Sequence, residues 1–190
     1  GPYKGIAPNA QLALMKVFPD SGSGASDGTV LRALNDCAKI GVDVVNMSLG
    51  SSLWDEPGDR AAEDGKDETT YSSAFRAFQK LSERGVQFAV SAGNEGRGNY
   101  LKDNDQTTNY GLYPNLPTDQ AELGILGSYA NSAYATIVAS SRLQADTSLK
   151  DATAYRQKVS GFSSDGVTWD LRLNPDIITP GESIWGATYY

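Results

Sequence analysis

One short polar turn carries the residues best suited to chemistry. Residues 91–96 read Ser-Ala-Gly-Asn-Glu-Gly and directly follow the apolar run Val86–Val90. The side-chain amide of Asn94 is a hydrogen-bond donor, and a donor held in place can stabilise negative charge that develops on a carbonyl oxygen. Asparagine beside glycine is also ordinary turn chemistry, so the turn alone leaves both interpretations open.

The 190 residues contain no histidine. Histidine is the commonest general base of enzymes and the usual partner of a nucleophilic serine or cysteine. A donor at Asn94 therefore needs a base that these residues do not supply in the usual form. A pair of Ser48 and Lys16 is a weak alternative, because nothing in the sequence places Lys16 in an apolar pocket that would lower the pKa of its amine.

The first half of the chain alternates between apolar strands and amphipathic helices. Strands are predicted at Leu12–Phe18, Val42–Met47 and Val86–Val90. Ser26 or Asp27 can cap the first helix and Gly41 can end it, while Gly85 follows the second. The apolar positions at helical spacing are Val30, Leu31, Leu34, Cys37 and Ala38 in the first helix, and Tyr71, Ala74, Phe75, Phe78 and Leu81 in the second.

This order of elements predicts an α/β fold with a mainly parallel sheet covered by helices on both faces. Ligands of such sheets bind at the carboxyl ends of the strands. The candidate site therefore lies where two strands end, and its residues are Ser48, Leu49, Gly50, Ser91, Ala92, Gly93 and Asn94.

The second half of the chain is less periodic. A strand is predicted at Ala135–Ala139, and short extended pieces are predicted at Phe162–Ser164 and Pro175–Ile178. The polar stretch Arg142–Gln157 shows no clear pattern.

The segment from about Ser51 to Thr70 is strongly acidic and holds Pro and Gly breakers. It is predicted to be a solvated surface loop, since runs of charge rarely pack into a core. A calcium loop is the alternative, because clustered carboxylates suit that cation, but the spacing is not that of an EF-hand. No metal ligand is therefore assigned.

Composition excludes several other classes of protein. A formal net charge of -7 argues against nucleic acid as a partner, because phosphate binding needs clustered Lys and Arg. We predict neither a membrane span nor a signal peptide. Cys37 is the one cysteine and is predicted to be a buried thiol. Gly22-Ser23-Gly24 lacks the third glycine of a dinucleotide-binding loop, so that class is disfavoured.

Four stretches together resemble the subtilisin-like serine proteases. They are Gly5–Ala10 with the apolar run after it, Val44–Gly50, Ser91–Gly96 and Pro175–Gly181, and they occur in the order of that family. Thr179 is a departure, because the family more often has alanine there.

Two further stretches resemble the lactocepin-type cell-envelope proteinases. They are Gly124–Ala130, continuing to Ala135–Ser140, and Lys158–Ser164, running on to Asn174–Asp176. These relatives are secreted or wall-attached, which implies an extracellular or cell-envelope location. Many carry a protease-associated domain between the two stretches. Only Arg142–Gln157 occupies that gap here. Either this protein naturally lacks the inserted domain, or the domain has been removed from the sequence.

The resemblance implies a three-layer α/β/α fold and a Ser-His-Asp mechanism acting on polypeptides without a cofactor. It assigns the oxyanion donor to Asn94, the substrate-pairing strand to Ser48–Gly50, and one wall of the specificity pocket to Ser91–Gly93. The small pocket residues favour a bulky apolar side chain in the substrate.

In the family the catalytic Asp and His precede the first of the four stretches, and the catalytic Ser follows the last. We therefore expect residues 1–190 to be the central part of a peptidase domain, truncated at both ends and inactive alone. Structural calcium is possible in the parent protein. The remaining alternative is a noncatalytic pseudoprotease module that binds extended peptides without cleaving them.

Overall fold

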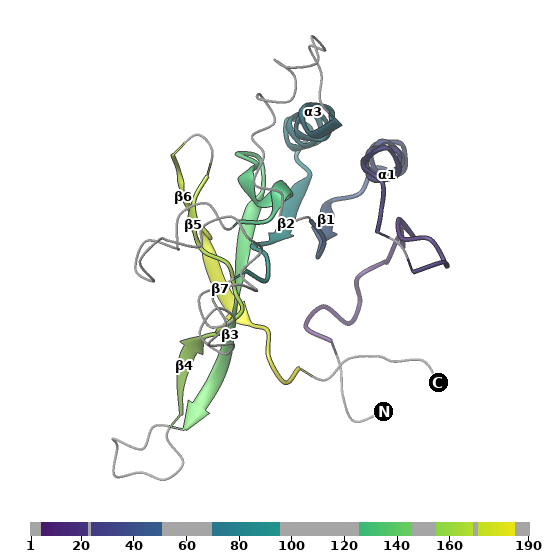
Figure 1. Cartoon of the computed structure of the whole chain (residues 1–190). Coiled ribbons are helices and arrows are strands. Elements are labelled where there is room, and N and C mark those ends of the chain that lie inside the picture. Colours follow the sequence, from purple (N-terminus) through teal and green to yellow (C-terminus); the bar gives the residue numbers. More distant parts are fainter. Residues whose placement is uncertain are drawn as a thin grey trace.

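The fold is known from a computed structural model that describes residues 5–22, 24–50, 70–95, 126–145, 155–168 and 171–184. Two α-helices, one 3-10 helix and seven strands occur among these residues (Figure 1). In chain order they are α1 (Asp27–Ile40), β1 (Val44–Met47), α3 (Thr70–Ser82), β2 (Gln87–Ser91), η1 (Ser128–Asn131), β3 (Thr136–Ala145), β4 (Tyr155–Val159), β5 (Gly166–Val167), β6 (Leu173–Asn174) and β7 (Ile177–Pro180).

The ends of α1 are set by local chemistry that the sequence predicts. The hydroxyl of Ser26 accepts a hydrogen bond from the backbone N–H of Thr29 at 3.3 Å, which satisfies one of the donors left open in the first turn. Gly41 ends the helix with a φ of 76°, and its N–H donates to the carbonyl of Cys37 at 3.0 Å. The predicted cap and stop are therefore confirmed.

Strands β1, β2, β3 and β7 run parallel, which confirms the predicted sheet type. Val45 pairs with Phe88, Ala89 pairs with Thr136, and Val138 of β3 pairs with Ile177 of β7. Only β4 runs antiparallel to its neighbour in this sheet, and β5 and β6 form a separate two-stranded sheet. The predicted strands Val42–Met47, Val86–Val90, Ala135–Ala139 and Pro175–Ile178 all overlap observed strands.

Both α-helices cover the same face of the sheet. Side chains of α1 and α3 share one hydrophobic core with Val45, Phe88 and Ile137, which point to that face from three neighbouring strands. The intervening residues point the other way, and Val44 is 61% exposed. Within the described residues, the predicted cover on both faces is therefore seen on one face only.

The predicted strand Leu12–Phe18 does not form among the described residues. Met15 and Val17 pack against the core, while Leu12 and Leu14 are 80% and 86% exposed. This alternation is that of an extended chain, but within the described residues the segment pairs with no neighbouring strand. Apolar alternation records which side chains face the core, and it does not require a hydrogen-bonded neighbour.

The stretch Arg142–Gln157 contributes to an antiparallel pair that the sequence does not reveal. Arg142 pairs with Lys158 and Leu143 pairs with Gln157, so β3 continues past the parallel sheet and returns as β4. This arm extends away from the helices (Figure 1). Beyond Ser141, the described side chains of this arm are exposed, and Leu143 is 71% exposed, so burial imposes no apolar pattern on them. Phe162–Ser164, predicted as extended, instead forms part of a turn and the coil after it.

We expect Phe78→Ala to be the most damaging truncation in the core. Phe78 is 0% exposed, and its ring lies 4.6 Å from that of Phe88 and 6.0 Å from that of Tyr129, measured between centroids. Removing such a ring costs about 3–5 kcal/mol of unfolding free energy. Leu14→Ala is the control, because an exposed side chain changes stability by about 0.5 kcal/mol or less. Chemical denaturation monitored by circular dichroism measures the unfolding free energy of both variants. Equal losses of unfolding free energy would contradict the assignment of Phe78 to the core.

We also expect the thiol of Cys37 to react slowly in the folded protein. Burial, and then the negative charge of Asp36, raise the pKa of the Cys37 thiol above its ordinary value. Less thiolate is then present near neutral pH, and the thiolate is the reactive form. Alkylation by iodoacetamide, followed by mass spectrometry, is expected to be much faster after unfolding in guanidinium and to rise with pH. Equal rates in the folded and unfolded protein would contradict a buried thiol.

Candidate active site

The two predicted binding segments lie at the same edge of the sheet. Strands β1 and β2 are parallel and Met47 pairs with Val90, so the chain leaves both strands in the same direction. Ser48–Gly50 follows β1, and Asn94 lies three residues beyond the end of β2. Asn94 is exposed, whereas Ala92 before it is 1% exposed. The structure therefore presents the amide of Asn94 from a turn whose base is buried.

Gly127 and Ser128 join these two segments, and the sequence alone does not place them in the site. The N–H of Gly127 donates to the carbonyl of Ala92 at 2.7 Å. On the other side, a Cβ built on Gly50 would lie 3.6 Å from the hydroxyl of Ser128. The start of η1 thus packs between the end of β1 and the end of β2. No local sequence signal could have revealed this contact, because it joins three segments far apart in the chain.

The turn that carries Asn94 is fixed by contacts from three directions. The N–H of Ala92 donates to the carbonyl of Val138 in β3 at 3.0 Å. The N–H of Asn94 donates to the carboxylate of Glu95 at 2.8 Å, and the N–H of Glu95 donates to the hydroxyl of Ser164 at 3.0 Å. Neither Glu95 nor Ser164 was predicted as a site residue.

In the described part of this turn, both the backbone conformation and the surrounding atoms exclude a side chain at Gly93. Its φ is 121°, a value that residues with a Cβ rarely adopt. A Cβ there would also lie 2.6 Å from the hydroxyl of Ser164 and 2.7 Å from the carboxylate of Glu95. The glycine of the turn is therefore required by both backbone conformation and space.

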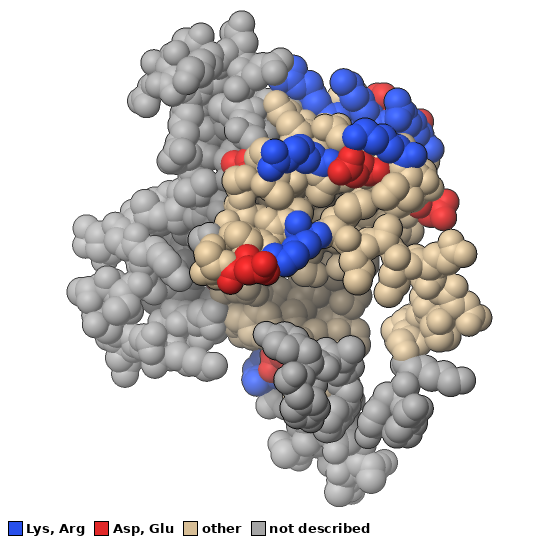
Figure 2. Space-filling model, turned by 90° about the vertical axis from the view of Figure 1, so that its right-hand side faces the viewer, with Lys and Arg blue, Asp and Glu red and all other residues tan. Residues whose placement is uncertain are grey.

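Charged side chains gather on the helices. α1 and α3 carry Arg32, Lys39, Arg76 and Lys80, and Lys39 pairs with Asp36 at 2.7 Å. Figure 2 shows basic side chains at the top of one face, where Figure 1 has the two helices, with acidic side chains among them. In the described part of the turn of Asn94, the charged side chain is that of Glu95, whose carboxylate is hydrogen-bonded to the turn itself.

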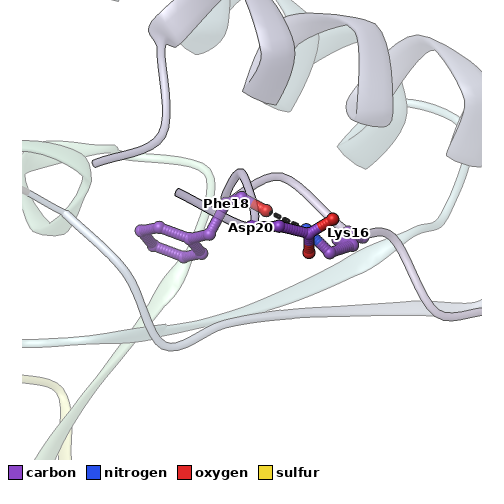
Figure 3. Close-up of polar contacts among 3 residues, drawn as sticks. All are labelled: Lys16, Phe18 and Asp20. Atoms are coloured by element: carbon purple, nitrogen blue, oxygen red, sulfur yellow. Dashed lines mark hydrogen bonds and ion pairs between the residues drawn. The ribbon is translucent and has the colours of Figure 1, made fainter. Parts of the chain in front are cut away.

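The structure rules out the Ser48–Lys16 pair. The side chain of Lys16 is 65% exposed and pairs with the carboxylate of Asp20 at 2.9 Å. Its amine also donates to the carbonyl of Phe18 (Figure 3). An exposed amine beside a carboxylate is not in the apolar environment that would make it a base.

Several predicted features concern residues outside the described ranges. These include nearly all of the acidic segment 51–70, with its calcium alternative, and Gly96. Within the described ranges, no group of three or more His, Cys, Asp or Glu could hold a metal ion. No helix in the described part of the chain is both long and apolar enough for a membrane span.

Comparison with known proteins identifies the family of this chain. The sequence profile of the Subtilase family matches residues 2–190. The PIII-type proteinase of Lactococcus lactis subsp. cremoris (strain SK11) is 38% identical over 138 residues, and the PII-type proteinase of Lacticaseibacillus paracasei is 37% identical over 176 residues. These matches cover 72% and 92% of this chain, but the chain spans only 6% and 8% of the relatives' own length.

Solved structures show the same fold. The structure of prenylagaramide maturation protease PagA aligns with 98% of this chain and 48% of its own, with a TM-score of 0.59 and 20% identity. The epidermin leader peptide processing serine protease EpiP from Staphylococcus aureus aligns with 87% of this chain and 33% of its own, with a TM-score of 0.51 and 20% identity. These neighbours confirm the predicted three-layer α/β/α class with a mainly parallel sheet, and the described residues show the sheet and the helices on one of its faces. With a family profile that matches nearly its whole length, the chain belongs to the subtilase family.

Proposed function

We propose that this chain supplies the oxyanion donor and the substrate-binding strands of a serine-type endopeptidase. The observation that carries the proposal is the position of Asn94, exposed on a fixed turn at the edge where β1 and β2 both end. A donor that is already oriented before the reaction loses no free energy to reorganisation when charge develops. Membership of the subtilase family supports peptide-bond hydrolysis as the reaction.

In the proposed reaction a serine hydroxyl attacks the carbonyl carbon of the scissile peptide bond. A histidine takes the hydroxyl proton and later gives it to the leaving amine, while an aspartate orients that histidine. The carbonyl oxygen becomes negatively charged in the tetrahedral intermediate, and the side-chain amide of Asn94 donates a hydrogen bond to it. These 190 residues hold no histidine, so this segment alone is proposed to be inactive. No cofactor takes part.

The edge beside Asn94 is proposed to bind the substrate. An extended peptide can pair with exposed backbone as an added strand, and Ser48 and Gly50 are exposed beyond β1. Ser91, Ala92 and Gly93 form one wall of the proposed specificity pocket, and Gly127 donates to that wall at 2.7 Å. The small side chains leave room, so we propose a bulky apolar residue on the acyl side of the cleaved bond.

The relatives named as proteinases support a polypeptide as the substrate. We also propose an extracellular or cell-envelope location, on the resemblance to cell-envelope proteinases. The competing proposal is a pseudoprotease that uses the edge beyond β1 to hold peptides without cleaving them. Cleavage of casein by the full-length protein distinguishes the two.

We expect Asn94→Ala in the full-length protein to lower kcat by about 10²–10³ with little change in KM. That range is the one known for subtilisin's own asparagine. KM is spared because the interaction forms only in the transition state. Gln79→Ala is the control, since it removes a side-chain amide that binds Glu83, four residues further along and just after the end of α3, and it should leave kcat unchanged. Steady-state kinetics on a fluorogenic peptide measure both, and an unchanged kcat in Asn94→Ala would refute the proposed role.

We expect Gly93→Ala to lower both stability and activity. The positive φ costs about 1–3 kcal/mol for a residue with a Cβ, and the new methyl group must displace both the Ser164 hydroxyl and the Glu95 carboxylate. Gly24→Ala is the matched control, because a Cβ there would meet no atom within 4 Å. Thermal unfolding and peptide hydrolysis, measured on the same full-length variants, test this. A Gly93→Ala variant as stable and active as Gly24→Ala would contradict the crowded turn.

A further inference from the structure

We propose that Glu95 and Ser164 act as a clamp on the backbone around Asn94, which holds the side-chain amide of Asn94 in position. Both are then positioning residues for the reaction. This inference rests on the proposed function of Asn94. It adds two residues to the site, one next to Asn94 in sequence and one brought to it by the fold.

The clamp consists of four hydrogen bonds. The Glu95 carboxylate accepts from the N–H of Asn94 at 2.8 Å and from the hydroxyl of Ser164 at 3.1 Å. The Ser164 hydroxyl in turn accepts from the N–H of Glu95 at 3.0 Å, and the Ser164 N–H donates to the carbonyl of Gly93 at 3.2 Å. The Gly93 carbonyl and the N–H groups of Asn94 and Glu95 thus each have a partner in the clamp. Two of the four bonds have a charged acceptor, which strengthens them.

Ser164 is suited to be the fixed side of the clamp. It is 0% exposed, and the loop of residues 160–164 that carries it is bound to β3. The N–H of Ser160 donates to the carbonyl of Ser140 at 2.9 Å, and the hydroxyl of Ser163 accepts from the N–H of Ser140 at 3.0 Å. The position of Ser164 is therefore set by the central sheet, and Ser164 adds a second anchor to the turn of Asn94, whose start is already held by the hydrogen bonds of Ala92.

The clamp matters for the reaction because an oxyanion donor depends on placement. A displacement of about 1 Å can cost two orders of magnitude in rate. The N–H of Asn94 and the N–H of Glu95 flank the side chain of Asn94, and the clamp holds both. Loss of either clamp residue frees the backbone on one side of the donor without touching the substrate strand at Ser48–Gly50.

The test compares Glu95→Ala, Ser164→Ala and Glu95→Gln in the full-length protein. We expect the two alanine variants to lower kcat by about tenfold or more at nearly constant KM, because the displaced donor is used only in the transition state. Glu95→Gln should recover most of kcat, since an amide oxygen can accept the same two hydrogen bonds. A loss in Glu95→Gln as large as in Glu95→Ala would overturn the assignment of Glu95 as an acceptor.

Two matched controls separate positioning from general loss of structure. Glu83→Ala removes an exposed carboxylate just after the end of α3, and Ser132→Ala removes a buried hydroxyl that accepts from the N–H of Tyr134 at 3.2 Å. Both should leave kcat unchanged. Thermal unfolding of every variant is measured in parallel, and a kcat loss in Ser132→Ala equal to that in Ser164→Ala would overturn the proposal.

A double-mutant cycle with Asn94→Ala gives the decisive result. If Glu95 and Ser164 act through the amide of Asn94, removing either from the Asn94→Ala enzyme should lower kcat by less than about twofold. A loss as large as in the enzyme that retains Asn94 would overturn the clamp while leaving the oxyanion role intact. If Asn94→Ala itself leaves kcat unchanged, the proposed function fails, and the clamp fails with it.

Discussion

The ring of Phe78 is the contact on which the rest of the described structure depends. It is fully buried and meets Phe88 of β2 and Tyr129 of η1, so a single side chain of α3 joins three elements. Burial of an aromatic ring is among the largest stabilising contributions that one residue can make. η1 begins just after Gly127, so packing of Tyr129 against Phe78 also helps to hold Gly127 where its N–H donates to the carbonyl of Ala92. The packing of the hydrophobic core therefore also positions the candidate site.

Parallel pairing of the strands brings the candidate site residues to one edge of the sheet. Strands β1 and β2 are fixed in register by Val45 and Phe88, which face the helices, and the residues beyond their ends are then brought to one edge. The proposed specificity and donor positions therefore follow from strand length and direction, and the loops need supply only the side chains. Tyr129 adds a link at the far side of the core, where its hydroxyl donates to the carboxylate of Asp27 at 3.0 Å, at the start of α1.

Elements with strong local signals were predictable from the sequence. Ser26 and Gly41 mark both ends of α1, and the apolar runs before Ser48 and Ser91 identify β1 and β2. The strand-end rule then predicts that the segments after these two strands lie at one edge of the sheet, as the parallel pairing of β1 and β2 requires, while the roles of their residues stay predictions. Elements held by long-range contacts were not predictable. Leu143 is exposed on the arm, and Ser164, although it ends a stretch that resembles the cell-envelope proteinases, has no local feature that predicts a contact with the turn of Asn94. Its role depends on burial beside Gly93, which only the fold creates.

Gly93 and Ser164 are distant in the chain, but they compete for the same space in the fold. The space that a side chain at position 93 would need is already filled by the Ser164 hydroxyl and the Glu95 carboxylate. These positions are therefore not free to change independently during evolution. A relative that carries a larger residue in place of Gly93 is expected to carry a smaller one in place of Ser164, and to hold its asparagine by some other means.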